Sequence, residues 1–292
     1  MTEAAAGLEW GRRYLMCPPR HFGVLYEINP WMSREVSVDP EQALAQWEGL
    51  VATLEAAGAE VVVMEPAADV PDLVFTANAG LVNGGQFVPS HFRHPERRPE
   101  TPINAAWFGE RGWRVDHLPA EVDHEGAGDA LPFTPEGGPT VLLSGYSFRS
   151  DARAATELST LLACPVRPIQ LVDPRLYHVD LTFCPLDARR AIVAPLGWDA
   201  YGRKVVEALV EEPLVLSDEE ALSFCANSVV VGDTIVMPAV PPRVGRQLDA
   251  WGLTVVGCQV DEFLKAGGGC RCLTLALDVR VSPDAPPAPE PL

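Results

Sequence analysis

A glycine-rich segment near the C-terminus, GGGCRCLT at residues 267–274, carries two cysteines that could react. Three glycines let the backbone approach a ligand closely, and adjacent N–H groups can face an anion or a developing charge. A cysteine directly after such a loop can be partly exposed and have a lowered pKa. Cys270 and Cys272 are two residues apart, so in a strand both side chains would face the same side. The alternative is a tight turn into a buried strand that holds two core thiols.

Two other segments combine residue types that transfer protons. In YHVDLTF, His178 and Asp180 lie on one side of a strand start, although a lone strand histidine is more often a packed residue. In HEGAGDAL, Glu125 precedes a Gly-Ala-Gly turn, which alone is typical of an ordinary polar loop. The pairing of His178 with Asp180 therefore indicates function more strongly than Glu125 does.

Three further segments could contact a ligand. DLVFTANAGLV carries Asp72, Phe75 and Asn78, RHPERRPE is a basic cluster at residues 93–100, and Arg149 follows a strand. Surface arginines are usually solvated or in weak ion pairs. Near a pocket, arginines also match the geometry of a carboxylate.

A repeated pattern indicates how these residues are positioned. A polar residue, an apolar run, a turn and a second apolar run recur from Asn78, Asp129, Asp180 and Asn227, at spacings of 51, 51 and 47 residues. Each copy predicts a β-hairpin, with turns in NGG, PEGG, LDAR and GD. A fifth copy starts at Cys272 but has no downstream partner. The segment RRYLMCPP near residue 14 can supply that partner by pairing the two ends of the chain.

Helical patterns separate the hairpins, so the predicted unit is hairpin, helix and strand, repeated about five times. In a ring of such units, the leading polar residues converge on one central pocket. The sequence therefore predicts an α/β fold in a single catalytic domain over residues 1–281, followed by a Pro-rich disordered tail over 282–292. The predicted helices cover residues 40–57, 151–163, 199–211 and 241–251, with a weaker candidate at 101–112.

The composition of the chain limits which classes of binding partner are expected. The formal net charge of −18 makes nucleic acid and anionic membrane surfaces poor partners. The N-terminus lacks the pattern of a signal peptide, and the seven cysteines are scattered, which favours a reduced, cytoplasmic protein. No cofactor or metal is predicted, because Cys270 and Cys272 lack a second cysteine or histidine pair at zinc-like spacing. A small-molecule substrate is expected, and a homo-oligomer is compatible with the sequence.

The motifs FTANAG, HPERR, EGAGD, YHVD and GGGxxCLT occur in this order between about residues 14 and 276. Together they resemble the guanidino-group-modifying, or pentein, superfamily of arginine deiminases, dimethylargininases, amidinotransferases and arginine dihydrolases. MCPPRHFGVLYEINPWM with FTANAG is most similar to the arginine dihydrolase and bacterial dimethylargininase-like branch. The resemblance implies a five-bladed ββαβ propeller with pseudo-fivefold symmetry, in agreement with the repeat.

The resemblance also implies roles. Cys272 would be the nucleophile and His178 the general acid–base, supported by Glu125. Asp180 would bind the guanidinium nitrogens. The other implied substrate contacts are Phe75 against the substrate, Arg149 and Arg97 at its α-carboxylate, Asn29 at the entrance, and Asp72.

One position departs from arginine deiminases, where an aspartate corresponds to Asn78. An asparagine both donates and accepts, so it suits a guanidinium and also the ureido group of citrulline. We therefore hypothesise that the enzyme takes arginine through citrulline to ornithine. The nearest alternative is the same chemistry on dimethylarginine. Amidinotransfer, a non-catalytic arginine-binding protein, and a thiol redox or metal protein are weaker alternatives.

Overall fold

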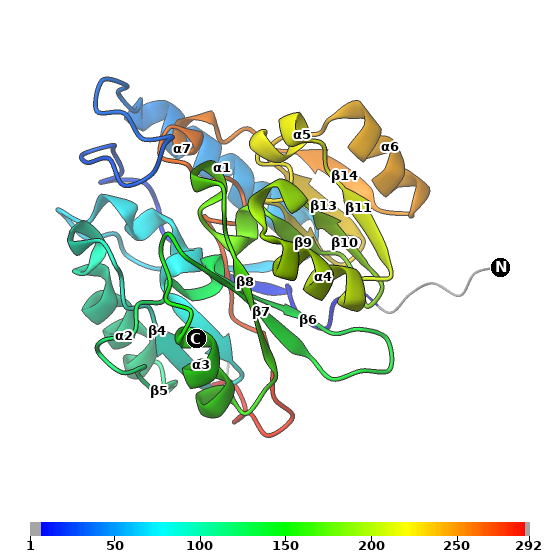
Figure 1. Cartoon of the computed structure of the whole chain (residues 1–292). Coiled ribbons are helices and arrows are strands. Elements are labelled where there is room, and N and C mark those ends of the chain that lie inside the picture. The colour runs from blue at the N-terminus through cyan, green and yellow to red at the C-terminus, as the bar shows by residue number, and fades with distance from the viewer. Residues whose placement is uncertain (1–6, 290–292) are drawn as a thin grey trace.

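The computed structural model describes residues 7–289 of the chain and shows a mixed α/β fold with five three-stranded sheets (Figure 1). Every sheet has an antiparallel pair and a third strand that runs parallel to the middle strand. The first sheet contains β15 (Leu275–Ala276), β1 (Arg13–Met16) and β2 (Glu60–Val63), in that order. The others contain β3 (Gly80–Asn83), β4 (Gln86–Pro89) and β5 (Arg114–Val115); β6 (Ala130–Phe133), β7 (Val141–Tyr146) and β8 (Val166–Gln170); β9 (Phe183–Pro185), β10 (Arg190–Val193) and β11 (Glu212–Val215); and β12 (Val229–Val231), β13 (Thr234–Met237) and β14 (Thr254–Gly257).

A helix connects the middle strand of each sheet to its third strand, because parallel neighbours need a crossover connection. These helices are α1 (Pro40–Ala56), α2 (Glu100–Glu110), α3 (Ala154–Leu162), α4 (Ala200–Leu209) and α6 (Pro242–Ala250). The predicted order of hairpin, helix and strand is thus confirmed in all five units. Two short helices that were not predicted, α5 (Asp218–Leu222) and α7 (Asp261–Leu264), lie outside this pattern. Among residues 7–289, no helix is both long and apolar enough to cross a bilayer.

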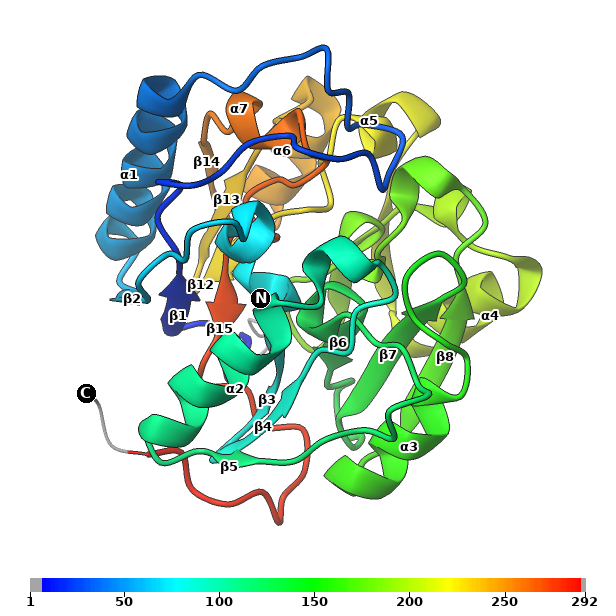
Figure 2. The same cartoon turned by 90° about the vertical axis from the view of Figure 1, so that its left-hand side faces the viewer.

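The first sheet joins the two ends of the chain, as the sequence predicted. Tyr14 pairs with Ala276 and Leu15 with Leu275, antiparallel, and Figure 2 shows β1 beside β15. Residues after β15 then pass the turn between β3 and β4, where the Gly85 N–H donates to the Pro286 carbonyl (2.7 Å). Residues 290–292 lie outside the described part, and the disorder of the tail stays a prediction.

Hydrogen bonds connect the starts of the five hairpins in a closed circuit. Each bond links a residue at one strand start to the next unit, and the fifth returns to the first. The bonds are Asn78 Nδ2 to the Glu125 carbonyl (2.9 Å), Val179 N–H to Asp129 Oδ1 (3.2 Å), Asn227 Nδ2 to the Asp180 carbonyl (3.3 Å), Cys272 N–H to Asn227 Oδ1 (3.2 Å) and Ala77 N–H to the Cys272 carbonyl (3.1 Å).

The packing beneath this circuit fixes the direction of the polar side chains. Val179 is fully buried in an apolar cluster with Phe183 and Trp198. The Trp198 indole N–H donates to Thr182 Oγ1 (2.8 Å), which holds the same short turn from the other end. This anchoring of Val179 positions its neighbours His178 and Asp180.

Candidate active site

The glycines of residues 267–269 are required by the side chains that pack against them. Gly267 has a φ of +82°, and a Cβ there would lie 2.9 Å from both Asn29 Oδ1 and Tyr177 Oη. A Cβ on Gly268 would overlap the Phe75 ring. The glycine run therefore brings the backbone before Cys272 against three side chains from distant segments.

Cys272 lies in a turn between two polar partners. Its thiol donates to Asp180 Oδ2 (3.4 Å), and Asn227 Nδ2 donates to its sulfur (3.1 Å). Burial, and after it the negative charge of Asp180, raise the pKa of the Cys272 thiol well above its ordinary value. The expectation of a partly exposed cysteine with a lowered pKa is therefore wrong: Cys272 is only 3% exposed.

Cys270 has a different environment. Residues 270–273 form a turn and not a strand, so the expected alternation of side chains does not apply to this pair. Cys270 is completely buried, and its thiol interacts with that of Cys258. Within residues 7–289, no group of three or more metal-binding side chains is arranged to hold an ion.

His178 belongs to a buried chain of charged groups. Its Nε2 lies 2.9 Å from Glu125 Oε2, and Arg149 donates to the same oxygen (2.8 Å). Burial opposes ionisation of Glu125, but Arg149 and His178 together hold its pKa below the usual range. An ionised carboxylate only accepts hydrogen bonds, so Nε2 carries the proton of the neutral ring and Nδ1 keeps its lone pair.

The imidazole itself is neutral near pH 7. Burial lowers the pKa of His178 to about 4, and this effect outweighs its hydrogen bond to Glu125. A neutral histidine with a free Nδ1 lone pair is ready to accept a proton. Cys272 and His178 are therefore both uncharged, and the site does not hold a thiolate together with a charged histidine.

Three buried carboxylate oxygens at the site have no hydrogen-bond partner within residues 7–289: Asp72 Oδ1, Glu125 Oε1 and Asp180 Oδ1. Burial raises the pKa of Asp180 to about 7, although Arg271 and hydrogen bonds from Cys272 and Asn227 oppose the rise. Unpaired buried acceptors are costly, so these oxygens favour a ligand that brings several donors and positive charge.

Asn78 connects two parts of the site. Its Nδ2 donates to the Glu125 carbonyl (2.9 Å), and its Oδ1 accepts from Arg97 (3.1 Å). The amide still has one N–H and one lone pair without these partners. A Cβ on Gly128 would overlap the Asn78 amide and lie 3.3 Å from His178 Nδ1, so this glycine lets the two side chains approach each other.

The two arginines that were expected at a substrate carboxylate are already paired. Arg97 binds Glu100 through two hydrogen bonds (2.7 and 2.8 Å) and lies 3.7 Å from Asp72. Arg149 binds Glu125 and packs over the Tyr177 ring at 4.6 Å. Binding of an α-carboxylate by these arginines stays a prediction.

A loop over residues 17–38, with no helix or strand, contacts the site. Asn29 donates to the Ala266 carbonyl (3.0 Å), and the Ile28 carbonyl accepts from Arg149 (3.2 Å). Phe75 lies 5% exposed, edge-on to Phe22 of this loop at 5.6 Å between ring centroids. The structure therefore brings Asn29 and Phe75 to the same glycine segment. The roles of Asn29 at the entrance and of Phe75 against the substrate stay predictions.

Three residues to which the sequence assigned no catalytic or binding role also contribute to the site. Asn227 contacts the Cys272 sulfur, and Tyr177 Oη donates to the Gly267 carbonyl (2.7 Å). Asp129 accepts from Ser150 (2.6 Å) and from the Val179 N–H. The repeat contained a signal for Asn227 and Asp129, because both lead a hairpin, whereas Tyr177 had no signal.

Comparison with known proteins identifies the class of protein to which the chain is similar. The chain is 41% identical over 275 residues to the bifunctional arginine dihydrolase/ornithine cyclodeaminase ArgZ of Synechocystis sp., which covers 93% of this chain and 38% of that protein. It is 37% identical over 268 residues to N(G),N(G)-dimethylarginine dimethylaminohydrolase of Mycobacterium tuberculosis, covering 91% of this chain and 86% of that protein. The chain thus spans less than two fifths of the length of the first of these relatives.

A solved structure agrees with these relatives. The N-terminal domain of ArgZ, a cysteine-to-serine variant bound to substrate, matches with a TM-score of 0.87 and 40% identity over 92% of this chain and 99% of that one. Residues 27–279 match the family described as N,N dimethylarginine dimethylhydrolase, eukaryotic. The chain belongs to this family.

Proposed function

We propose that this protein hydrolyses the guanidinium carbon of arginine-type substrates through a covalent intermediate on Cys272. The observation that carries the proposal is a buried thiol that donates to Asp180 Oδ2, in a site where one carboxylate oxygen each of Asp180, Glu125 and Asp72 has no donor within residues 7–289. A guanidinium group supplies planar N–H donors and one positive charge, which matches this set.

The substrate itself would activate the nucleophile. Its cation beside Cys272 lowers the thiol pKa that burial has raised, and the thiol proton passes to neutral His178. The thiolate attacks the guanidinium carbon, and the charged His178 protonates the departing nitrogen. His178 then removes a proton from the water that cleaves the thioether intermediate and restores the thiol.

For the substrate, we propose arginine, carried through citrulline to ornithine with release of two ammonia molecules and carbon dioxide. The amide of Asn78 supports this choice because it can accept from a guanidinium and donate to a ureido oxygen. The similarity to an arginine dihydrolase domain over 99% of that domain supports it as well.

Dimethylarginine is the alternative substrate, with dimethylamine and citrulline as products. The family match and the 37% identity to a dimethylarginine dimethylaminohydrolase favour it.

We also propose that the five sheets form a five-bladed ββαβ propeller with pseudo-fivefold symmetry, in a single domain that ends near residue 281. The closed circuit of hydrogen bonds between hairpin starts supports this arrangement.

One experiment tests the activity and the substrate together. The purified protein is incubated separately with arginine, citrulline and dimethylarginine, and the products are identified by mass spectrometry. We expect ornithine and ammonia from both arginine and citrulline, and no turnover by Cys272→Ser. Dimethylamine from dimethylarginine alone would select the alternative, and turnover by Cys272→Ser would refute the nucleophile.

A further inference from the structure

Asn227 is completely buried beside the proposed nucleophile, and its side-chain amide makes four hydrogen bonds. Its Oδ1 accepts from the backbone N–H groups of Arg271 (3.1 Å) and Cys272 (3.2 Å). Its Nδ2 donates to the Asp180 carbonyl (3.3 Å) and to the Cys272 sulfur (3.1 Å). An amide has two donors and two lone pairs, so these contacts use its full capacity.

The same contacts determine which end of the amide faces the sulfur. If the amide were reversed, its NH2 group would meet the two backbone N–H groups, which cannot accept a hydrogen bond. Gly269 lets the amide approach the turn, because a Cβ there would lie 2.8 Å from Asn227 Oδ1. The backbone of the turn that carries Cys272 therefore holds an N–H donor against the sulfur.

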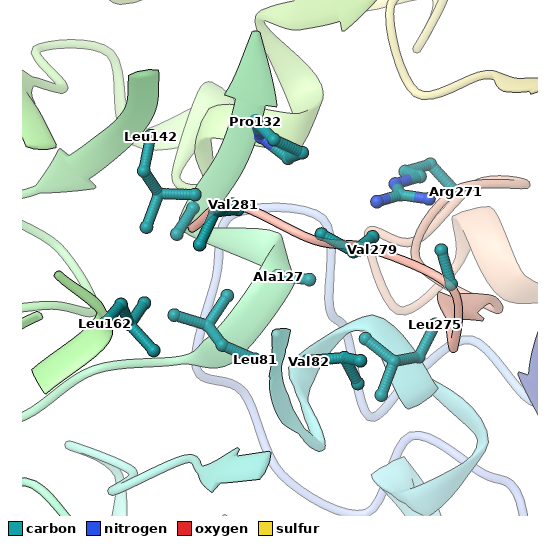
Figure 3. Close-up of a pocket in the computed structure, with 12 residues that line it drawn as sticks. Leu81, Val82, Ala127, Pro132, Leu142, Leu162, Arg271, Leu275, Val279 and Val281 are labelled. Carbon is teal, nitrogen blue, oxygen red and sulfur yellow. The ribbon is translucent and has the colours of Figure 1, made fainter. Parts of the chain in front are cut away.

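Within residues 7–289, no other side chain donates a hydrogen bond to this sulfur. Asp180 accepts from the thiol and, when ionised, can only accept. The side chain of the preceding residue, Arg271, lines an interior cavity with mainly aliphatic neighbours, and neither Cys272 nor Asp180 lines that cavity (Figure 3). Asn227 is therefore the side chain that supplies a hydrogen bond to the sulfur.

A negative sulfur needs such a donor, because its other surroundings oppose the charge. Burial and then Asp180 raise the pKa of the Cys272 thiol, whereas the Gly269 backbone and the Asn227 side chain act in the opposite direction. A hydrogen bond to an ionised acceptor is stronger than one to a neutral acceptor, so the Asn227 bond strengthens when the thiol loses its proton. Preorganised donors stabilise a developing oxyanion in the same way.

We propose that Asn227 is a catalytic residue, which stabilises the Cys272 thiolate through its Nδ2–H donor. This role rests on the proposed reaction. The thiol proton passes to His178, the electron pair stays on sulfur, and the sulfur–carbon bond forms while the departing nitrogen takes the proton from His178. Water then bonds to the carbon and gives a proton to His178, the carbon–sulfur bond breaks, and its electron pair returns to sulfur. Asn227 keeps its own protons and stabilises the thiolate before attack and after release.

Alkylation of the full chain by iodoacetamide measures the thiolate without any substrate. Digestion with trypsin after the reaction cleaves behind Arg271, so mass spectrometry follows Cys270 and Cys272 in separate peptides. Asn227→Asp keeps the shape of the side chain and an oxygen for the two backbone N–H groups, but it replaces the donor at the sulfur by an oxygen. Between pH 7 and 9, alkylation of Cys272 should become at least about tenfold slower, because a hydrogen bond to a charged group is lost.

Asn83→Asp is the matched control. Asn83 is also buried, at the end of β3, and its Oδ1 accepts from the N–H groups of Val281 (3.0 Å) and Ser282 (3.3 Å). Its Nδ2 donates to Gln86 Oε1 (3.2 Å). The control makes the same change of charge and hydrogen bonding away from the sulfur, so Cys272 should be alkylated at the parent rate.

Turnover provides the second readout. Asn227→Asp should lower kcat by about 10²-fold and change KM little, since the donor acts on the sulfur and not on bound substrate. A higher KM with unchanged kcat, or Cys272 alkylation as fast as in the parent, would overturn the proposal. If Asn227→Asp does not fold, Asn227→Ser replaces it, because its shorter side chain does not reach the sulfur.

The two readouts also separate this role from the proposed function. If the parent converts none of the guanidino or ureido compounds, the proposed function fails. The alkylation rates need no substrate, so they still decide whether Asn227 stabilises the thiolate.

Discussion

The resting state of Cys272 makes reactivity depend on what enters the site. Its thiol is buried beside Asp180, and both burial and that carboxylate keep it protonated. His178 is neutral because burial disfavours its charged form. A cationic substrate reverses both effects locally, so a bound guanidinium favours formation of the thiolate.

The titration of Asp180 predicts how binding depends on pH. Its pKa is raised to about 7, so the carboxylate takes up a proton as the pH falls through 7 and loses its attraction for a cation. In Cys272→Ser, which prevents turnover, the affinity for arginine should fall by up to about tenfold per pH unit below 7. Citrulline has an uncharged side chain and should change far less. Calorimetric titrations between pH 5.5 and 8.5 measure both.

Glu100 also has a pKa of about 7, raised by burial, so a control must separate the two groups. Adding Asp180→Asn should flatten the dependence for arginine if Asp180 causes it. Parallel pH profiles for arginine and citrulline would contradict this assignment.

We expect Asn78 to determine whether a second hydrolysis occurs. Asn78→Asp should still convert arginine to citrulline but lose ornithine formation by at least about tenfold, because an ionised carboxylate only accepts and repels a ureido oxygen. Arg97, which now donates to Asn78 Oδ1, can pair with the new carboxylate and support folding. The ratio of citrulline to ornithine, measured over time from either substrate, gives the result. Ornithine produced at the parent rate would refute this role.

At the scale of elements, the glycine segment and Phe75 form one packing unit. Gly268→Ala should lower the free energy of unfolding by about 1–3 kcal/mol, since its methyl group would overlap the Phe75 ring. Gly49→Ala is the matched control: it lies in α1 with open space around it and should gain about 0.5–1 kcal/mol. Denaturant unfolding measures both variants.

Phe75→Leu in the Gly268→Ala background should restore part of the lost stability, because the smaller side chain can withdraw from the added methyl group. A Gly268→Ala protein as stable as the parent would show that this contact does not constrain the segment.

The elements that the sequence predicts well are those with local signals. The helix from Pro40 begins where Asp39 accepts from the Glu41 and Gln42 N–H groups, which follows from residue types alone. The hairpins follow from alternating apolar runs and turn residues. The loop over residues 17–38 has no periodicity, so no local pattern predicts that it adjoins the site. The family resemblance implied this for Asn29, and the tertiary contacts of Asn29 and Ile28 show how the loop is held.

Burial could not be predicted from local signals, and it controls the chemistry of the site. The motifs indicated Cys272, His178 and Glu125, and in the structure the His178 ring is within hydrogen-bonding distance of the Glu125 carboxylate. The protonation states were not predictable, because they depend on how completely the fold removes water from each group. Asn227 could be expected at the centre from the repeat, but its contact with sulfur required the arrangement in space.

At the scale of the whole molecule, the fifth sheet needs both ends of the chain. Besides the pairing of β1 with β15, the Asp278 carboxylate accepts from the N–H groups of Gly11 (3.0 Å) and Arg12 (2.7 Å). This carboxylate connects segments more than 260 residues apart. The circuit of hydrogen bonds that contains Cys272 closes only if this sheet forms.

Asp278→Ala should therefore destabilise the molecule and also disturb the distant site. We expect a loss of about 1–2 kcal/mol, since two hydrogen bonds to a partly exposed carboxylate are removed. The exposed Asp284→Ala makes the same change of charge nearby and should have little effect. Hydrogen exchange shows where the structure is disturbed. In Asp278→Ala, the amides of β1, of β15 and of Ala77, whose N–H donates to the Cys272 carbonyl, should exchange faster than in the parent. The amides of β6 and β7 should stay protected. Uniform acceleration across all sheets would show that Asp278 acts on global stability alone and does not hold the ends together.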